Sequence, residues 1–181
     1  MTLAAELLTL KEFIHLPNIE ESPAWEFLDG VPCQKPMPTI YHSRLQKWLV
    51  ATIDNLSSPY EAFPELRCVL SHNSVVPDVA VLHQDRVPID NEPLNGAPDW
   101  VIEILSPDQS TTKVIAKIQS CLTEGTKLGW LIDSKEKVIM VFWSDRPLAL
   151  LKDQAVLPVI SDLELLLTVE QVFDCLQPNQ K

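Results

Sequence analysis

One charged residue inside an apolar run places the strongest constraint on this chain. Glu103 lies within Trp100–Leu105, where all its neighbours are strand formers. A lone ionised carboxylate in such surroundings destabilises a fold by roughly several kcal/mol unless a cation or strong hydrogen-bond donors meet it. Two partners could meet it. One is a metal ion shared with Asp78, and the other is a lysine of the helix that follows the strand. We therefore expect a metal site with a catalytic lysine around Glu103.

The hydrophobic periodicity predicts an α/β protein with a mixed central β-sheet flanked by helices. Asp29-Gly30 between two apolar-rich flanks predicts a tight hairpin, and Thr39 is placed to cap the helix that follows it. The helix that Thr168 begins has glutamine at the capping-box position. Other predicted helices cover 1–16 and 111–122. The predicted strands cover 65–70, 75–82, 100–105, 128–133, 138–143 and 148–151, and residues 83–98 form a long loop.

Length and composition favour one globular domain over residues 1–181, with an N-terminal support helix in 1–20 and a frayed tail at 178–181. The chain has no run of about 18 apolar residues and no signal-peptide pattern, so we expect a soluble, cytoplasmic protein without membrane contact. Its four cysteines are scattered, without the paired spacing of a structural zinc site.

The formal net charge of −11 argues against general nucleic-acid binding, because such binding draws most of its affinity from lysine and arginine. A nucleic-acid function must therefore depend on a local basic surface, a divalent metal ion, or a dimer that concentrates both.

Asp78 and Glu103 stand on neighbouring predicted strands, and their carboxylates repel unless a divalent cation lies between them. Mg²⁺ accepts one or two carboxylates and keeps several water ligands, which then serve as nucleophiles. On the next helix Lys117 falls at the margin of the apolar stripe, whereas Lys113 lies further towards solvent. Lys117 is thus the lysine that can reach back over the sheet.

Each candidate also has a simpler interpretation. Asp78 follows a proline and suits a turn at a strand entry. Glu26, on the first strand of the hairpin, suits a solvent-facing strand position. His42, in the first turn of its helix, suits a surface or capping position.

The order of these residues resembles that of the PD-(D/E)xK nuclease superfamily, in which Pro-Asp precedes a strand and a buried glutamate and a lysine follow. More narrowly, the chain from Trp25 to Phe142 is similar to the Uma-two family of restriction-endonuclease-like proteins, abundant in cyanobacteria. The segments that carry this resemblance are Glu26, Asp29-Gly30, His42, Pro77-Asp78-Val79-Ala80-Val81, Glu103-Ile104-Leu105-Ser106-Pro107, Lys117 and Leu128-Gly129-Trp130-Leu131-Ile132-Asp133.

The resemblance implies a restriction-endonuclease-like core and an endonuclease that uses Mg²⁺ or Mn²⁺ to hydrolyse phosphodiester bonds in DNA. Asp78 and Glu103 would hold the ion, with the backbone carbonyl of Ile104 as a further ligand. Lys117 would position the attacking water or stabilise the developing negative charge.

The same resemblance gives Glu26 a catalytic role, either through a metal-bound water or as the anchor of Lys117, and gives His42 a possible phosphate contact. One position departs from the superfamily pattern: the lysine expected two residues after Glu103 would fall on Leu105. In families of this type the lysine can move to the following helix, where Lys117 stands.

Two other functions compete with the nuclease. In the first, the fold is kept for binding, without catalysis, and Glu103 and Lys117 form a structural ion pair. In the second, the protein is another metal hydrolase that acts on a small phosphate ester. The apolar surface and the superfamily habit of cutting two strands with two subunits favour a homodimer.

Overall fold

The computed structural model describes residues 8–177, and its centre is a six-stranded mixed β-sheet. The strands lie in the order β11-β10-β9-β8-β6-β3, and within this sheet only β8 and β9 run parallel. Their bounds are β3 Tyr60–Pro64, β6 Val79–His83, β8 Trp100–Ile104, β9 Leu128–Asp133, β10 Val138–Phe142 and β11 Ala149–Leu151.

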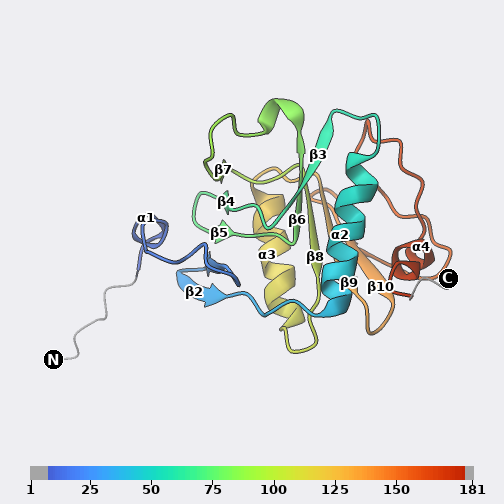
Figure 1. Ribbon diagram of the computed structural model, residues 1–181, viewed down its shortest axis with the longest axis horizontal. Coiled ribbons are helices and arrows are strands. Elements are labelled where there is room, and N and C mark those ends of the chain that lie inside the picture. The colour runs from blue at the N-terminus through green and yellow to red at the C-terminus, as the bar shows by residue number, and fades with distance from the viewer. Residues whose placement is uncertain (1–7, 178–181) are drawn as a thin grey trace.

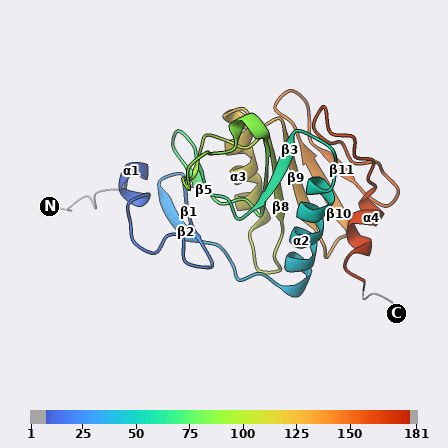
Figure 2. The same ribbon diagram turned by 45° about the horizontal axis from the view of Figure 1, so that its top comes forward.

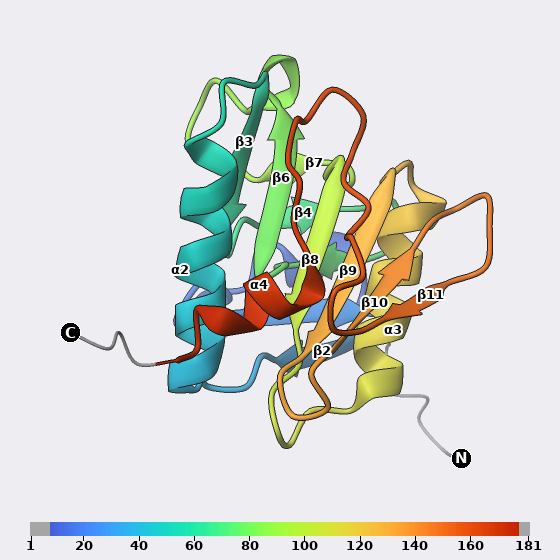
Figure 3. The ribbon, with the colours of Figure 1, turned by 90° about the vertical axis from the view of Figure 1, so that its right-hand side faces the viewer.

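Helices cover both faces of this sheet. Helices α2 (Ile40–Asp54) and α4 (Val169–Asp174) lie on one face, and α3 (Thr111–Thr123) lies on the other (Figure 3). Thr39 caps α2, and Thr168 opens α4 with a capping box, as the sequence predicts. Within residues 8–177, no helix combines the length and the apolar character that a bilayer crossing needs.

The side chains of β8 alternate between the two faces, and this alternation decides where Glu103 points. Trp100, Ile102 and Ile104 belong to the core beneath α2, whereas Val101 belongs to the core beneath α3. Because successive residues of a strand face opposite sides, Glu103 shares the α3 face with Val101.

A second, five-stranded sheet lies on the α3 side of the molecule, away from α2 and α4 (Figures 1 and 2). Its order is β2-β1-β5-β4-β7. The bounds are β1 Trp25–Leu28, β2 Val31–Gln34, β4 Cys68–Val69, β5 Ser74–Val75 and β7 Leu94–Asn95. Strands β1 and β2 form the predicted hairpin, in which Asp29 and Gly30 both have positive φ, at 50° and 81°.

Two predicted strands differ from the structure because the chain turns inside them. Glu65 has a φ of 54°, so the strand expected over 65–70 is wrong at its start: β3 ends before this turn and β4 begins after it. Pro77 separates β5 from β6, so the strand expected over 75–82 is two strands in different sheets. Proline has no amide hydrogen and cannot continue a ladder between two neighbours.

The predicted loop 83–98 contains the 3-10 turn η1 (Gln84–Arg86) and the short strand β7. Of the N-terminal helix expected over 1–16, the structure gives α1 (Leu10–Phe13). Residues 1–7 and the tail 178–181 lie outside the described residues.

Gly129 sets the distance between α3 and the central sheet. A Cβ atom at this position of β9 would stand 2.6 Å from the Ile118 Cγ2 atom of α3, which is closer than real contacts allow. The absence of a side chain therefore lets the helix lie close against the strands.

Candidate functional site

Asp78 and Glu103 meet at one end of strands β6 and β8. The antiparallel register pairs Val79 with Ile102, so extending it by one step sets Asp78 opposite Glu103. The amide of Ile104 donates to Asp78 Oδ2 over 2.7 Å. Both carboxyl groups are buried. The strand pairing alone therefore brings two acidic side chains into the interior.

Lys117 reaches this point from α3, on the face of the sheet to which Glu103 points. Its Nζ atom lies 2.8 Å from Glu103 Oε1 and 2.6 Å from Glu26 Oε1, and it donates to the carbonyl oxygen of Val76 over 3.0 Å. Glu26 is held in turn by the Val76 amide, which donates to Oε1 over 2.7 Å. One ammonium group thus faces two buried carboxyl groups.

A second lysine completes the other half of the site. The Nζ atom of Lys35 donates to Asp78 Oδ1 over 2.8 Å, to Glu65 Oε2 over 2.7 Å and to the Val76 carbonyl over 2.8 Å. Gln46 links two members of this half, since its side-chain amide donates to Glu65 Oε1 and to the backbone carbonyl of Asp78. The two ammonium groups meet at the same carbonyl oxygen of Val76, so the halves form one network.

Negative charge exceeds positive charge in this network, because four carboxyl groups share two ammonium groups. Burial raises the pKa of Glu103 to about 8, although Lys117 opposes the shift. Burial alone would also raise the pKa of Asp78, but Lys35 and His42 outweigh it and hold that pKa well below its usual value. Burial would lower the pKa of Lys117, yet Glu103 and Glu26 raise it well above its ordinary value.

Two buried groups of the site lack well-aligned hydrogen bonds among the described residues. Glu103 Oε1 lies near Lys117 but accepts no hydrogen bond of good geometry. Both ring nitrogens of His42 are without such a bond, although Nε2 lies 3.4 Å from Asp78 Oδ1 and the residue is 6% exposed. Buried polar atoms are normally satisfied, so the site has spare ligand capacity.

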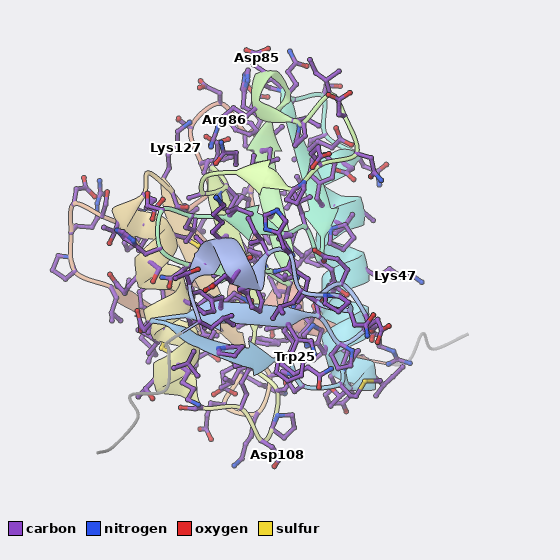
Figure 4. All side chains as sticks on the ribbon, turned by 90° about the vertical axis from the view of Figure 1, so that its left-hand side faces the viewer. Trp25, Lys47, Asp85, Arg86, Asp108 and Lys127 are labelled. Carbon is purple, nitrogen blue, oxygen red and sulfur yellow. The ribbon has the colours of Figure 1, made fainter. Side chains whose placement is uncertain are left out.

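Two pockets open onto the network from either side of the Lys35-Pro36 segment. The first has a volume of about 190 Å³ and is lined by His42, Gln46, Glu65 and Asp78 among others. The second has about 310 Å³, and its lining includes Glu26, Lys113 and Lys117 together with residues 108–110. Asp108, which lines the second pocket, lies at the lower end of the molecule in Figure 4.

The structure brings together most of the residues that the sequence singles out. Glu26, Asp78, Glu103 and Lys117 lie in one network, and His42 is buried beside Asp78 and not at the surface. Glu26 is buried as well, so its solvent-facing interpretation is wrong.

For Ile104 the recorded contact is that of its amide with Asp78, and a ligand role for its carbonyl stays a prediction. The roles of the other residues stay predictions too.

Sequence reasoning missed three members: Lys35, Glu65 and Gln46. Two signals could have found them. Gln46 follows His42 by one helical turn, so the two share a face of α2. Lys35 is the last cation before the helix that carries His42, and three interior carboxyl groups with a single lysine leave a charge imbalance that calls for one more.

The donor set fits a divalent metal ion. The ligand atoms of His42, Glu65 and Asp78 all lie within 4.8 Å of one another. Carboxylate oxygens suit Mg²⁺ and Mn²⁺, and an imidazole widens the choice to other transition metals. The unsatisfied His42 ring and the surplus of carboxyl groups are the features that such an ion would complete.

These features first define a class: an α/β fold whose mixed sheet brings paired carboxylates and a lysine to its strand ends is that of the restriction-endonuclease-like nucleases. The model of the Uma2 family, described as "Putative restriction endonuclease", matches residues 10–170, and the chain belongs to this family. Both the fold class and the family resemblance predicted from the sequence are confirmed.

Among solved structures, the chain is similar to a "putative nuclease belonging to DUF820" from Anabaena variabilis ATCC 29413. The two share 39% sequence identity with a TM-score of 0.87, and the match covers 94% of this chain and 99% of the other. No curated protein matches the chain.

Proposed function

We propose that this protein is an endonuclease that hydrolyses phosphodiester bonds in DNA with Mg²⁺ or Mn²⁺. The observation that carries the proposal is the pairing of buried Asp78 with buried Glu103 in a network of four carboxyl groups, one of them the partly exposed Glu65, and two ammonium groups. A divalent cation supplies the charge that the two lysines leave unbalanced.

Asp78 and Glu103 would hold the ion, with Glu65, His42 and the Ile104 carbonyl as further candidate ligands. When bound, the ion polarises a phosphate oxygen and lowers the pKa of a coordinated water.

The lysine of α3 then acts on the transition state. Lys117 presents a fixed ammonium group, held between Glu26 and Glu103, to the negative charge that develops on the phosphoryl group. Glu26 acts by keeping that ammonium in place. His42 contacts a phosphate oxygen or the ion from the first pocket.

The net charge of −11 requires a local gathering of cations for DNA, and the second pocket brings three lysines together beside Glu26 and Asp108. Lys35, Lys113 and Lys117 line it together with Ser110. A backbone phosphate entering there can meet the exposed ammonium of Lys113 before it reaches the buried network.

Two further parts of the proposal concern the setting of the activity. A homodimer would let two sites cut opposite strands, and light scattering on a size-exclusion column tests it. A cytoplasmic location agrees with four cysteines that are free thiols.

A nuclease-like binding protein without catalysis is the competing function, and one observation favours it: Lys117 already lies within ion-pair distance of both Glu103 and Glu26. In that case the ions would neither stabilise the protein nor support cleavage.

The decisive experiment combines cleavage with stability. Supercoiled plasmid and labelled oligonucleotides are incubated with the wild type, Asp78→Ala and Glu103→Gln in Mg²⁺ or Mn²⁺. We expect both variants to lose at least about 100-fold in cleavage rate, because each removes a ligand of the charge-stabilising centre. Glu61→Gln, an exposed change on β3, serves as the matched control and keeps wild-type activity.

Thermal melts of the same proteins accompany the assay. The ions should raise the melting temperature of the wild type and of Glu61→Gln, but not that of Glu103→Gln. Wild-type cleavage by Asp78→Ala would overturn the site. A wild type that neither cuts nor gains stability from the ions would favour the binding protein.

A further inference from the structure

The ammonium of Lys35 lies in a cage of three oxygen atoms that suits a cation. Its three donors meet three oxygen atoms, those of Asp78, Glu65 and the Val76 carbonyl, at 2.7 to 2.8 Å. The side chain is only 7% exposed, so the ammonium has given up most of its water for this cage. Burial would lower the pKa of Lys35, but Asp78 above all raises it, and the group stays charged.

The same cage has the ligands of a divalent metal site. Asp78 Oδ1, which accepts from Lys35, also lies 3.4 Å from His42 Nε2. The His42 ring is buried, lines the first pocket and lacks an aligned hydrogen-bond partner among the described residues. The His42 imidazole is therefore available as a metal ligand beside the Asp78 carboxylate to which Lys35 donates.

Lys35 also stands on a segment suited to movement. Residues 35–39, between β2 and α2, belong to no helix or strand. Lys35 and Pro36 line both pockets, so they form the partition between the two. Withdrawal of the lysine side chain would open the first pocket towards the second.

We infer that Lys35 is an internal counter-cation that occupies the position of the divalent ion, and that ion binding expels its ammonium from the cage. This inference rests on the proposed metal-dependent function and refines it. The ion-free protein is kept stable by its own lysine, and exchange of a single charge for a double one adds one positive charge to a network in which four carboxyl groups face two ammonium groups.

Chemical labelling of amines measures the exchange directly. The wild-type protein is treated with an acetylating reagent with and without millimolar Mn²⁺, and each lysine is followed by mass spectrometry. We expect Mn²⁺ to raise the labelling rate of Lys35 by at least about tenfold, the ratio for a shift of about 1.4 kcal/mol. Lys117 should stay protected, and the exposed Lys47 should be labelled equally in both conditions.

A variant tests the same competition through affinity. Lys35→Gln removes the competing ammonium, so its Mn²⁺ dissociation constant, measured by calorimetry, should be about tenfold lower than that of the wild type. Lys47→Gln removes the same charge from the exposed side of α2 and should bind Mn²⁺ as the wild type does. It therefore separates competition from a change in net charge.

The outcomes distinguish the inference from the proposed function. If the wild type binds Mn²⁺ while Lys35 stays protected and Lys35→Gln binds no tighter than Lys47→Gln, the inference fails and the metal-dependent nuclease stands. If Lys35→Gln alone binds the ion, Lys35 blocks the site in the wild type, and both the inferred exchange and metal-dependent catalysis by the wild type fail. If neither binds it, both fail.

Discussion

The two ends of strands β6 and β8 each bury a carboxyl group, but they treat it in opposite ways. At the end that carries Arg86 and Lys127 (Figure 4), Asp99 accepts the His83 amide over 2.9 Å. Arg86 Nη1 and Lys127 Nζ each lie 3.1 Å from its oxygens. At the other end Asp78 and Glu103 share their lysines with two more carboxyl groups.

The difference separates a structural carboxylate from a functional one. Asp99 has two cations and an amide to itself, and both cations keep contact with water, at 38% and 52% exposure. Its charge is fully balanced. The network around Glu103 is buried except for Glu65, has fewer ammonium than carboxyl groups and is flanked by two pockets, so it gains from a ligand that Asp99 does not need.

Among variants at the two ends, Lys117→Met should have the largest effect on stability. It leaves Glu26 and Glu103 buried without their ammonium, so we expect a loss of about 3 to 5 kcal/mol in the free energy of unfolding. A urea titration measures it. Lys113→Met, on the exposed side of the same helix, should change stability by less than about 0.5 kcal/mol. Equal losses in the two variants would contradict a buried network that depends on Lys117.

Asp99→Asn should have a moderate effect that depends on pH. Burial would raise the pKa of Asp99, but the His83 amide, Lys127 and Arg86 hold it below its ordinary value of 3.8. A depressed pKa adds stability that is present above the unfolded pKa and is lost as pH falls through the folded one. At neutral pH the variant should therefore be about 1 to 2 kcal/mol less stable than the wild type.

This gap should close as the pH drops below about 4. Thermal melts from neutral to acid pH measure it, and ion-dependent stabilisation should remain intact in the variant. A gap that widens in acid would show that Asp99 is not held ionised by its partners.

Lys127→Gln should have the smallest effect. Its pair with Asp99 is half exposed, and such pairs contribute less than about 1 kcal/mol. Urea titrations at low and high salt should differ little from those of the wild type, since Arg86 and the His83 amide still satisfy Asp99. A loss as large as that of Lys117→Met would erase the distinction between the two ends.

The sequence predicted the half of the site that regular structure positions. Strand periodicity and the helical angle placed Glu103 and Lys117 together, because both depend only on backbone repeats. The other half depends on irregular backbone: Glu65 sits in a left-handed turn and Lys35 on a segment between two elements. No periodicity describes where such residues point, so they could not be placed without coordinates.

Beyond its β1–β2 hairpin, the small sheet escaped prediction for a related reason. Its strands β4, β5 and β7 have two residues each, which is too short to show an alternating pattern. Their pairing is decided by long-range packing against the α3 side of the molecule.

The missing side chain at Gly129 affects the proposed chemistry although Gly129 lines neither pocket of the site. A β-carbon on β9 would push against Ile118, the neighbour of Lys117 in the chain. The distance between α3 and the sheet therefore determines how far the Lys117 ammonium reaches into the site. A single methyl group at Gly129 would push the helix outward and withdraw that charge. We therefore expect Gly129 to tolerate substitution poorly, because it fixes the position of Lys117 from outside the pockets.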